Sequence, residues 1–226
     1  MRHSLARPPL AALIAAFLGV ACGAQGEPAA ESAESADASP ELEAQAAPEA
    51  TQAPQEAASF EFTSTDYWDS GITFHVTSPN SGSITEVTIT PSGLEIDNSP
   101  VTVEVDGTVT GAEVGDLNLD GSPEIYVYAT SAGSGSYGSL IAYGTNNRKS
   151  MSPIYLPPVE ENPEASPGYM GHDEFAVVES TLVQRFPVYL EGDSNAQPTG
   201  GTRQVQYKLE AGEAGWVLRP DEVIEY

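Results

Sequence analysis

Cysteine, basic residues and long apolar runs are all scarce in this sequence of 226 residues. The one cysteine, Cys22, has no partner for a disulfide within the chain, so the hydrophobic core must hold the fold. Eight Lys and Arg against 33 Asp and Glu give a formal net charge of −25, which disfavours nucleic acid and anionic lipids and favours cationic partners. The longest apolar run, 10–20, is shorter than the ~20 residues of a membrane-spanning helix.

The few basic residues divide the chain into three zones. Residues 1–22 contain Arg2 and Arg7 and no acidic residue, whereas residues 23–58 contain eight acidic residues and no Lys or Arg. Ala, Glu, Pro, Gln and Ser make up nearly all of 23–58, a composition that cannot bury enough apolar surface to fold. We therefore expect a disordered acidic tether at 23–58, followed by one folded domain at 59–226 with a formal charge of about −19.

The first zone predicts an export signal at 1–22. A basic start and the apolar run lead into Leu18-Gly-Val-Ala-Cys22, which resembles a bacterial lipobox with Gly19 at a position usually held by a large aliphatic residue. In a lipobox the cysteine is acylated and becomes the new N-terminus, and the alternative is ordinary signal cleavage nearby. Acylation predicts a lipoprotein of the cell envelope, facing the periplasm or the surface. Gly23 favours the outer membrane, with the lipid anchor as the only membrane contact.

Lipid attachment at Cys22 can be tested directly. The intact mass of membrane-extracted protein should include several acyl chains, because one chain anchors a protein only marginally. Cys22→Ser should shift the protein to soluble or unprocessed forms. A wild-type protein that is lipid-free in the periplasm would contradict the prediction.

From Ser59 onward, apolar and polar residues alternate, as in a half-buried β-strand. No window of eleven or more residues has a helical period, and Asp106-Gly107 predicts a tight hairpin. Strands at this spacing, without helices for crossovers, predict an all-β fold: an antiparallel β-sandwich or small barrel. The predicted strands are 60–62, 72–76, 84–89, 101–105, 125–128, 140–143, 175–178, 182–190, 205–209 and 216–218.

One acidic turn has oxygen ligands at a spacing typical of calcium loops. Asp116, Asn118, Asp120 and Glu124 stand at loop positions 1, 3, 5 and 9, with Gly121 at position 6. The position-12 glutamate of an EF-hand is missing. Two interpretations stay open, a β-type calcium turn and an Asx-rich turn whose side chains bond their own backbone. The second is favoured, so we expect calcium to bind weakly or not at all, and no other cofactor.

The sequence lacks the signatures of a catalytic site. His172-Asp173-Glu174 has suitable residue types for metal or acid–base chemistry, but adjacent residues of an extended chain point to alternate faces. The chain has no nucleophile motif, no phosphate-cradling glycine loop and no metal-ligand spacing. We therefore expect that the protein is not an enzyme.

The segment Ser131-Ala-Gly-Ser-Gly-Ser-Tyr-Gly-Ser139 stands between two predicted strands. Its three glycines permit positive φ and close backbone approach, while the serines and Tyr137 present hydroxyl groups at the tip. From the residues alone, this segment is either a binding loop or simply the flexible end of a hairpin.

Within this loop, Ser134-Gly-Ser-Tyr137 resembles the Ser-Gly-x-Tyr signature of bacterial periplasmic lysozyme inhibitors. From about Gly115 to Tyr226 the chain is similar to the inhibitors of invertebrate-type (I-type) lysozyme, whereas 59–114 matches only as a generic β lead-in. The stretches that carry the resemblance are DLNLDGSPEIYVY, SAGSGSYGSLIAY, NNRKSMSPIYLPP, GYMGHDEFAVVE, QRFPVYLEGDSNA and TGGTRQVQYKLE.

The resemblance implies an antiparallel β domain, often a homodimer, that inserts this loop into the active-site cleft of an I-type lysozyme. Ser134 and Tyr137 match the signature, and Gly135 and Ser136 lie between them. Glycosidase clefts carry two catalytic carboxyl groups, to which a serine hydroxyl and a phenol can donate hydrogen bonds.

Two further points bear on the partner. Arg148 and Lys149 form a basic pair close to the loop in sequence, and we expect a secondary contact there with acidic groups of the enzyme. The long acidic tether at 23–58 is a feature that a freely soluble periplasmic inhibitor would not be expected to have. The alternative function is a non-catalytic envelope or adhesion module, calcium-stabilised or not, that binds glycan or another surface protein.

Overall fold

The computed structural model describes residues 58–213 and 215–226. The predicted export signal, Cys22 and nearly all of the predicted acidic tether lie outside these ranges. No helix within them has the length and hydropathy needed to span a bilayer. Strands make up most of the described chain, which confirms the all-β prediction.

Twelve strands and three short 3₁₀ helices follow one another along the described residues. The strands are β1 (Phe60–Thr63), β2 (Thr73–Ser78), β3 (Ile84–Ser92), β4 (Val101–Asp106), β5 (Thr108–Gly115), β6 (Glu124–Thr130), β7 (Gly138–Thr145), β8 (Met151–Tyr155), β9 (Glu174–Val178), β10 (Thr181–Pro187), β11 (Thr202–Ala211) and β12 (Trp216–Glu225). The helices are η1 (Tyr67–Asp69), η2 (Asn146–Arg148) and η3 (Val159–Glu161).

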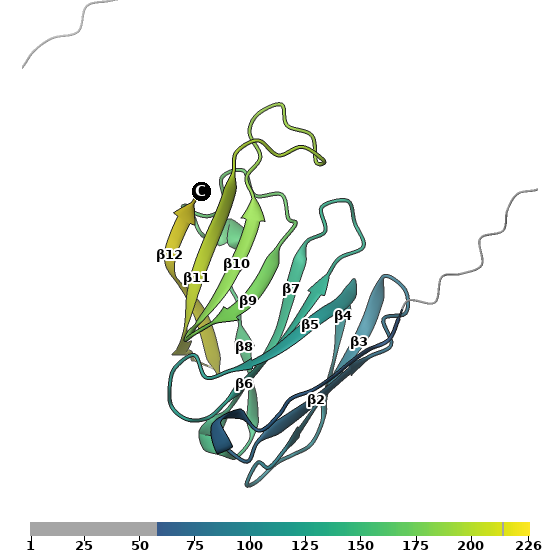
Figure 1. Ribbon diagram of the computed structural model, residues 1–226, viewed down its shortest axis with the longest axis vertical. Coiled ribbons are helices and arrows are strands. Elements are labelled where there is room, and N and C mark those ends of the chain that lie inside the picture. Colours follow the sequence, from purple (N-terminus) through teal and green to yellow (C-terminus); the bar gives the residue numbers. More distant parts are fainter. Residues whose placement is uncertain (1–57, 214) are drawn as a thin grey trace, which may run out of the picture. The chain divides into compact units, whose positions relative to one another are not determined.

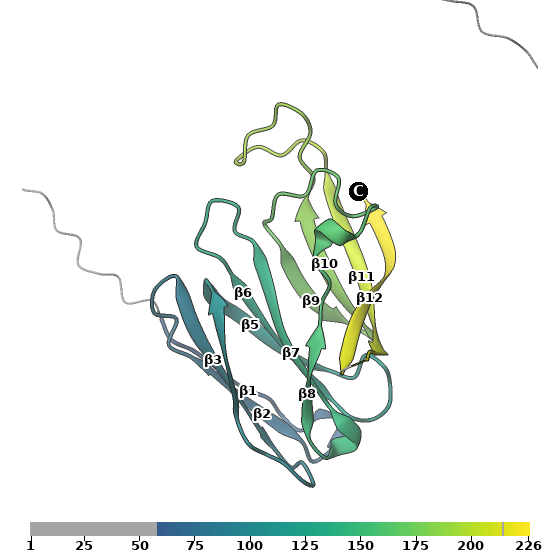
Figure 2. The same cartoon turned by 180° about the vertical axis from the view of Figure 1, so that it is seen from behind.

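The strands form two sheets (Figures 1 and 2). One is four-stranded and antiparallel, in the order β1-β2-β3-β4. The other has the order β5-β6-β7-β8-β12-β11-β10-β9 and is antiparallel except where β8 pairs with β12. The eight-stranded sheet curls until its edge strands β5 and β9 approach each other. There the Val177 N–H donates to Glu113 Oε2 at 2.9 Å, and the Tyr128 and Phe175 rings stack at 5.7 Å. The result is a nearly closed barrel.

Strand β6 lies between two hydrophobic cores, so both of its faces are buried. Tyr126 and Tyr128 point into the inner core, which the eight-stranded sheet encloses. Ile125 and Val127 point the other way, into an outer core shared with strands β2 and β3 of the four-stranded sheet. Burying each of these large side chains contributes about 1.5–3 kcal/mol. Strand β6 is therefore a firm base for the loop that follows it.

The hairpin predicted at Asp106-Gly107 was wrong. Strand β4 pairs with β3, whereas β5 pairs with β6, so the chain changes sheets at this dipeptide. Gly107 has φ +107°, and a Cβ there would lie 2.0 Å from the Thr130 carbonyl oxygen. The glycine is therefore needed for a close crossing between two sheets rather than for a two-residue turn.

Candidate functional site

Residues 131–137 form the loop between β6 and β7, as the sequence indicates. Strand pairing runs up to Thr130 and Gly138, and the Ser131 N–H then donates to the Tyr137 carbonyl at 2.9 Å. The Tyr137 N–H returns a bond of 3.0 Å to Ser131 Oγ, and the Ser136 N–H donates to the Gly133 carbonyl at 2.9 Å. The loop thus has its own hydrogen-bonded turn.

The loop glycines do not have the expected positive φ, and at this tip it is Ser136 that does, at +43°. Two glycines serve close packing instead. A Cβ at Gly135 would lie 2.4 Å from the Tyr137 ring, and one at Gly138 would lie 2.6 Å from Asp173 Cβ. The glycines therefore let the loop pack closely against the neighbouring residues of the domain. The loop is not the freely flexible end of a hairpin.

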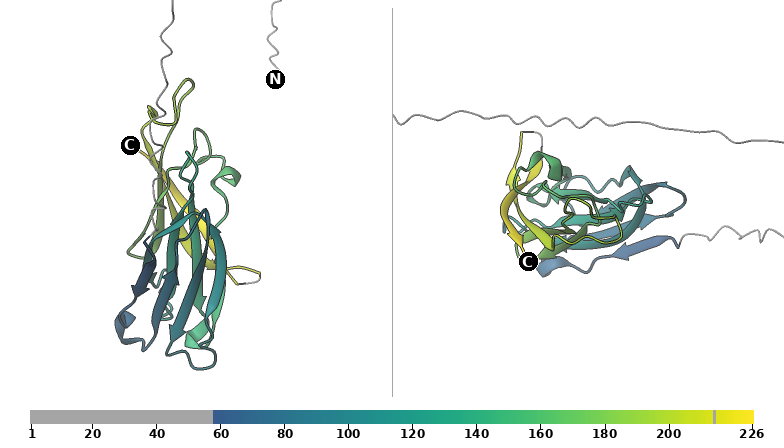
Figure 3. Two further views of the ribbon diagram at one scale, coloured as in Figure 1. Left: turned by 90° about the vertical axis from the view of Figure 1, so that its right-hand side faces the viewer. Right: turned by 90° about the horizontal axis from the view of Figure 1, so that it is seen from above.

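Two other segments hold this loop at the same end of the barrel (Figure 3). The His172 N–H donates to the Gly135 carbonyl at 2.8 Å, and Asn195 Nδ2 donates to the Ser134 carbonyl. The Tyr137 ring packs edge-on against Tyr169, with 5.8 Å between ring centroids. Three separate contacts therefore fix the backbone and the ring of the loop.

Beneath the loop, Asp173 is the centre of a polar network that is partly buried. Its carboxylate accepts hydrogen bonds from the Gly138 N–H at 2.8 Å, the Tyr169 hydroxyl at 2.8 Å and Gln184 Nε2 at 2.7 Å. The Tyr207 hydroxyl donates to Gln184 Oε1 at 2.8 Å and extends the network into the inner core. Burial raises the pKa of Asp173 despite these donors, and burial with the nearby Asp173 charge raises the pKa of Tyr169.

The side chains of Ser134 and Tyr137 are exposed, and Tyr137 is 44% exposed. The contacts that hold these residues use backbone atoms and the tyrosine ring. Within the described part of the chain, both hydroxyl groups therefore stay available for a partner. Such a pair of hydroxyl groups can donate hydrogen bonds to carboxylates.

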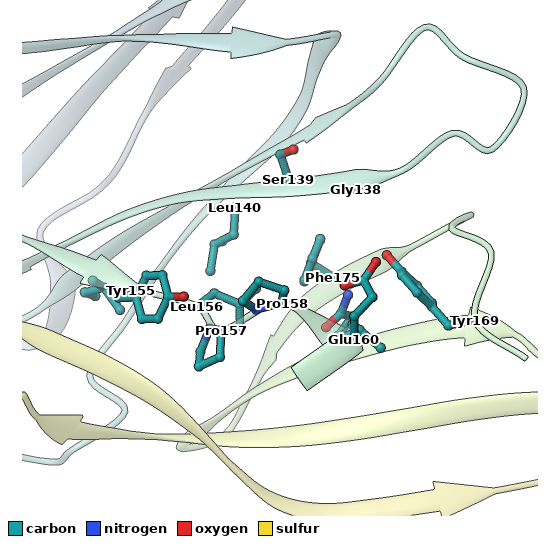
Figure 4. Close-up of a pocket in the computed structure, with 13 residues that line it drawn as sticks. Gly138, Ser139, Leu140, Tyr155, Leu156, Pro157, Pro158, Glu160, Tyr169 and Phe175 are labelled. Carbon is teal, nitrogen blue, oxygen red and sulfur yellow. The ribbon is translucent and has the colours of Figure 1, made fainter. Parts of the chain in front are cut away.

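A cleft of about 430 Å³ adjoins the base of the loop (Figure 4). The start of β7 forms one wall, and the segment from Ile154 to Glu160 forms the facing wall. Tyr155 and Tyr169 lie toward its opposite ends in Figure 4, with Phe175 between them. Hydrophobic and aromatic side chains with a few polar groups among them are the usual lining of a ligand-binding cleft.

Arg148 and Lys149 do not lie beside the loop. They lie in and just after η2, beyond the far end of β7 from Tyr137, about 26 Å along the strand at 3.3 Å per residue. Arg148 Nε donates to the Gly121 carbonyl at 2.9 Å, which places it against the acidic turn. The secondary contact expected at this basic pair is therefore not continuous with the Ser134–Tyr137 surface.

In the acidic turn, the side-chain oxygens are bonded to the turn's own backbone. The two Asp116 oxygens accept the N–H groups of Asp120 and Gly121, at 3.0 and 2.8 Å. Asn118 Oδ1 also accepts from Asp120 N–H, at 3.1 Å. Glu124 is 2% exposed and accepts the Leu117 N–H at 2.9 Å; burial raises its pKa to about 8. Among the described residues, no group of three or more His, Cys, Asp or Glu is arranged to hold a metal.

We expect thermal melts in millimolar calcium and in chelator to nearly coincide. The Asp116 oxygens already have backbone donors, and the sequence lacks the position-12 glutamate. A site of micromolar affinity would add several kcal/mol of stability by mass action. Melts in magnesium control for ionic strength, and a large upward shift specific to calcium would show that the turn is a calcium site.

His172, Asp173 and Glu174 diverge in the structure. Asp173 points into the polar network, Glu174 is exposed, and the His172 ring lies against Tyr189 with Nε2 3.4 Å from Asn195 Oδ1. Sequence reasoning missed the structural role of Asp173, and it missed Asn195 altogether. The contact from Asn195 to Ser134 spans 61 residues, and no local pattern reports it.

No protein-family model, curated protein or solved structure matches this chain. The geometry of the loop and its supports, together with the residues of the sequence, is therefore the basis for assigning a function.

Proposed function

We propose that this domain inhibits an I-type lysozyme by inserting the Ser134–Tyr137 loop into the active-site cleft of the enzyme. The observation that carries the proposal is an exposed tyrosine and serine on a loop whose backbone is held by Asn195 and His172. A loop that is already ordered loses little conformational entropy on binding, so more of its contact energy appears as affinity. In the cell envelope, such an inhibitor would protect the wall of the bacterium that makes it.

The chemistry of the loop suits a glycosidase cleft. Tyr137 supplies a flat apolar ring with a hydroxyl at its end, the kind of side chain that anchors interfaces. Its hydroxyl and that of Ser134 would donate to the catalytic carboxylates, and hydrogen bonds to a charged acceptor are stronger than neutral ones. The domain charge of about −19 would speed the encounter with a cationic enzyme.

A turbidity assay of cell-wall lysis tests the proposal. The protein is added at equimolar amount to I-type, C-type and G-type lysozymes, with heat-unfolded protein as the control. We expect near-complete inhibition of an I-type enzyme and far weaker effects on the other two classes. Undiminished lysis by I-type lysozymes at a several-fold excess of folded protein would contradict the proposal.

The aromatic lining of the cleft favours a second candidate, a non-catalytic envelope module that binds glycan. Tyr155, Tyr169 and Phe175 present rings on which sugars could stack. Cosedimentation with purified peptidoglycan distinguishes the two candidates. Binding to the wall without inhibition of any lysozyme would favour the glycan-binding module.

A further inference from the structure

The loop between β10 and β11, residues 188–201, has an ordered shape of its own. Asp193 organises it, because its carboxylate accepts the Leu190 N–H at 2.7 Å, the Thr199 N–H at 2.8 Å and the Thr199 hydroxyl at 2.8 Å. These hydrogen bonds lower the pKa of Asp193. An exposed loop with this many internal bonds has few conformations to lose when a partner binds.

The base of the 188–201 loop is fixed to the barrel. The Gly200 N–H donates to the Val188 carbonyl at 2.8 Å, and the Tyr189 N–H donates to the Gly168 carbonyl at 2.9 Å. Both glycines are needed for this approach, because a Cβ at either would lie 2.6 Å from a backbone oxygen of Val188 or Tyr189. The loop is therefore attached to 168–173, the segment that also contacts Gly135.

Asn195 joins the three segments. Its Nδ2 donates to the Ser134 carbonyl, its Oδ1 lies 3.4 Å from His172 Nε2, and its backbone carbonyl accepts the Tyr189 hydroxyl at 3.0 Å. A carbonyl only accepts hydrogen bonds, so the amide nitrogen must face Ser134 and the amide oxygen must face His172. His172 Nε2 is then the donor.

We propose that the 188–201 loop is part of the inhibitory surface and that Asn195 is a positioning residue, which holds the Ser134 carbonyl so that Tyr137 projects correctly. This inference deepens the proposed function and rests on it. The surface then comprises 131–137, 168–173 and 188–201, and none of these ranges contains Lys or Arg. Met170, Leu190 and Tyr137 are exposed in these segments. It fits an enzyme surface that is apolar around the cleft and bears cationic rather than acidic groups at its rim.

Hydrogen exchange of the free protein tests the positioning role without any enzyme. Asn195→Ala should speed exchange of the Ser136 and Tyr137 amides severalfold, because both make hydrogen bonds inside the loop. The melting temperature should stay within about 2 °C of wild type, since the residue is partly exposed and outside the core. Asn195→Asp keeps the shape but removes the donor, so it should match the alanine variant. Gln197→Ala, exposed in the same loop, is the control and should leave exchange unchanged.

The same variants are then titrated against an I-type lysozyme. Asn195→Ala and Asn195→Asp should weaken inhibition about tenfold, because each variant loses one hydrogen bond that holds the loop in its binding conformation. Glu104→Ala, exposed on β4 and outside the three segments, is the control for binding and should inhibit like wild type. If amide exchange in the loop is unchanged in Asn195→Ala, the positioning role is overturned, whether or not inhibition falls. If exchange is faster but inhibition is undiminished, positioning of the loop by Asn195 does not matter for binding. If wild-type protein inhibits no I-type lysozyme, the proposed function fails, and the exchange data still decide the role of Asn195.

Discussion

Replacing Tyr137 by alanine should weaken inhibition of an I-type lysozyme by about thirtyfold or more. Truncation of an aromatic anchor at the centre of an interface commonly costs about 2 kcal/mol or more of binding free energy, which corresponds to that factor. The folded protein should lose little stability, on the order of 1 kcal/mol, because the ring is 44% exposed and makes one edge-on contact with Tyr169. Inhibition constants from cell-wall lysis and denaturant unfolding curves provide the two readouts.

Two further variants separate the contribution of the ring from that of the hydroxyl groups, and a third is the control. Tyr137→Phe should lose only the share of the hydroxyl, and Ser134→Ala should lose less than Tyr137→Ala because one hydrogen bond goes with it. Tyr155→Ala is the matched control, since Tyr155 is a 57% exposed tyrosine toward the other end of the cleft. Should Tyr137→Ala remain folded and inhibit like wild type, this loop is not the inhibitory element.

Asp173→Ala should destabilise the protein by about 3–4 kcal/mol and weaken inhibition as well. It leaves the Gly138 N–H, the Tyr169 hydroxyl and Gln184 Nε2 without their acceptor in a part-buried site. An unpaired donor costs about 1–3 kcal/mol when it is buried, and less when it is partly exposed. Urea unfolding at neutral pH measures the loss. Asp106→Ala is the control, because Asp106 is an exposed aspartate at the end of β4. A loss below about 1 kcal/mol would show that the network does not support the loop.

The cost of Asp173→Ala should also be greater near pH 4 than near pH 7. Burial raises the pKa of Asp173 in the folded state above its value in the unfolded chain, so the folded state binds the proton more tightly. Its contribution to stability is then greatest at low pH and falls as pH rises from about 3.9 through the raised pKa. A cost that grows with pH would instead mean that the three donors outweigh burial.

The strands that could be predicted are those with clear alternation, such as β2 and β3, where every second residue is buried and those between are more exposed. Two strands were missed. Strand β5 contains two glycines, and β8 is five residues long with Pro153 inside it, and glycine and proline are both depleted in strands. The point at which the chain crosses from one sheet to the other was also not predicted. Gly107 looks like a hairpin residue locally, but the close approach of Thr130 that determines its role comes from a distant strand.

For the site, the sequence could predict a hydroxyl-bearing loop between two strands, because the strand pattern on either side is local. It could not predict what holds the loop. The contacts of Asn195 with Ser134 and of Asp173 with Gly138 span 61 and 35 residues, and they exist only once the barrel has closed. The same reason explains Arg148, which is near the loop in sequence but lies beyond the opposite end of β7.

The central claim is that the Ser134–Tyr137 loop occupies the cleft of an I-type lysozyme, and competition with a cleft ligand tests it most directly. Binding of the protein to the enzyme is measured by calorimetry at increasing concentrations of an N-acetylglucosamine oligosaccharide. We predict mutual exclusion, with an apparent Kd that rises in proportion to the oligosaccharide once its own Kd is exceeded, and with the stoichiometry unchanged. An apparent Kd that does not respond to a saturating oligosaccharide would place the contact outside the cleft and contradict the account.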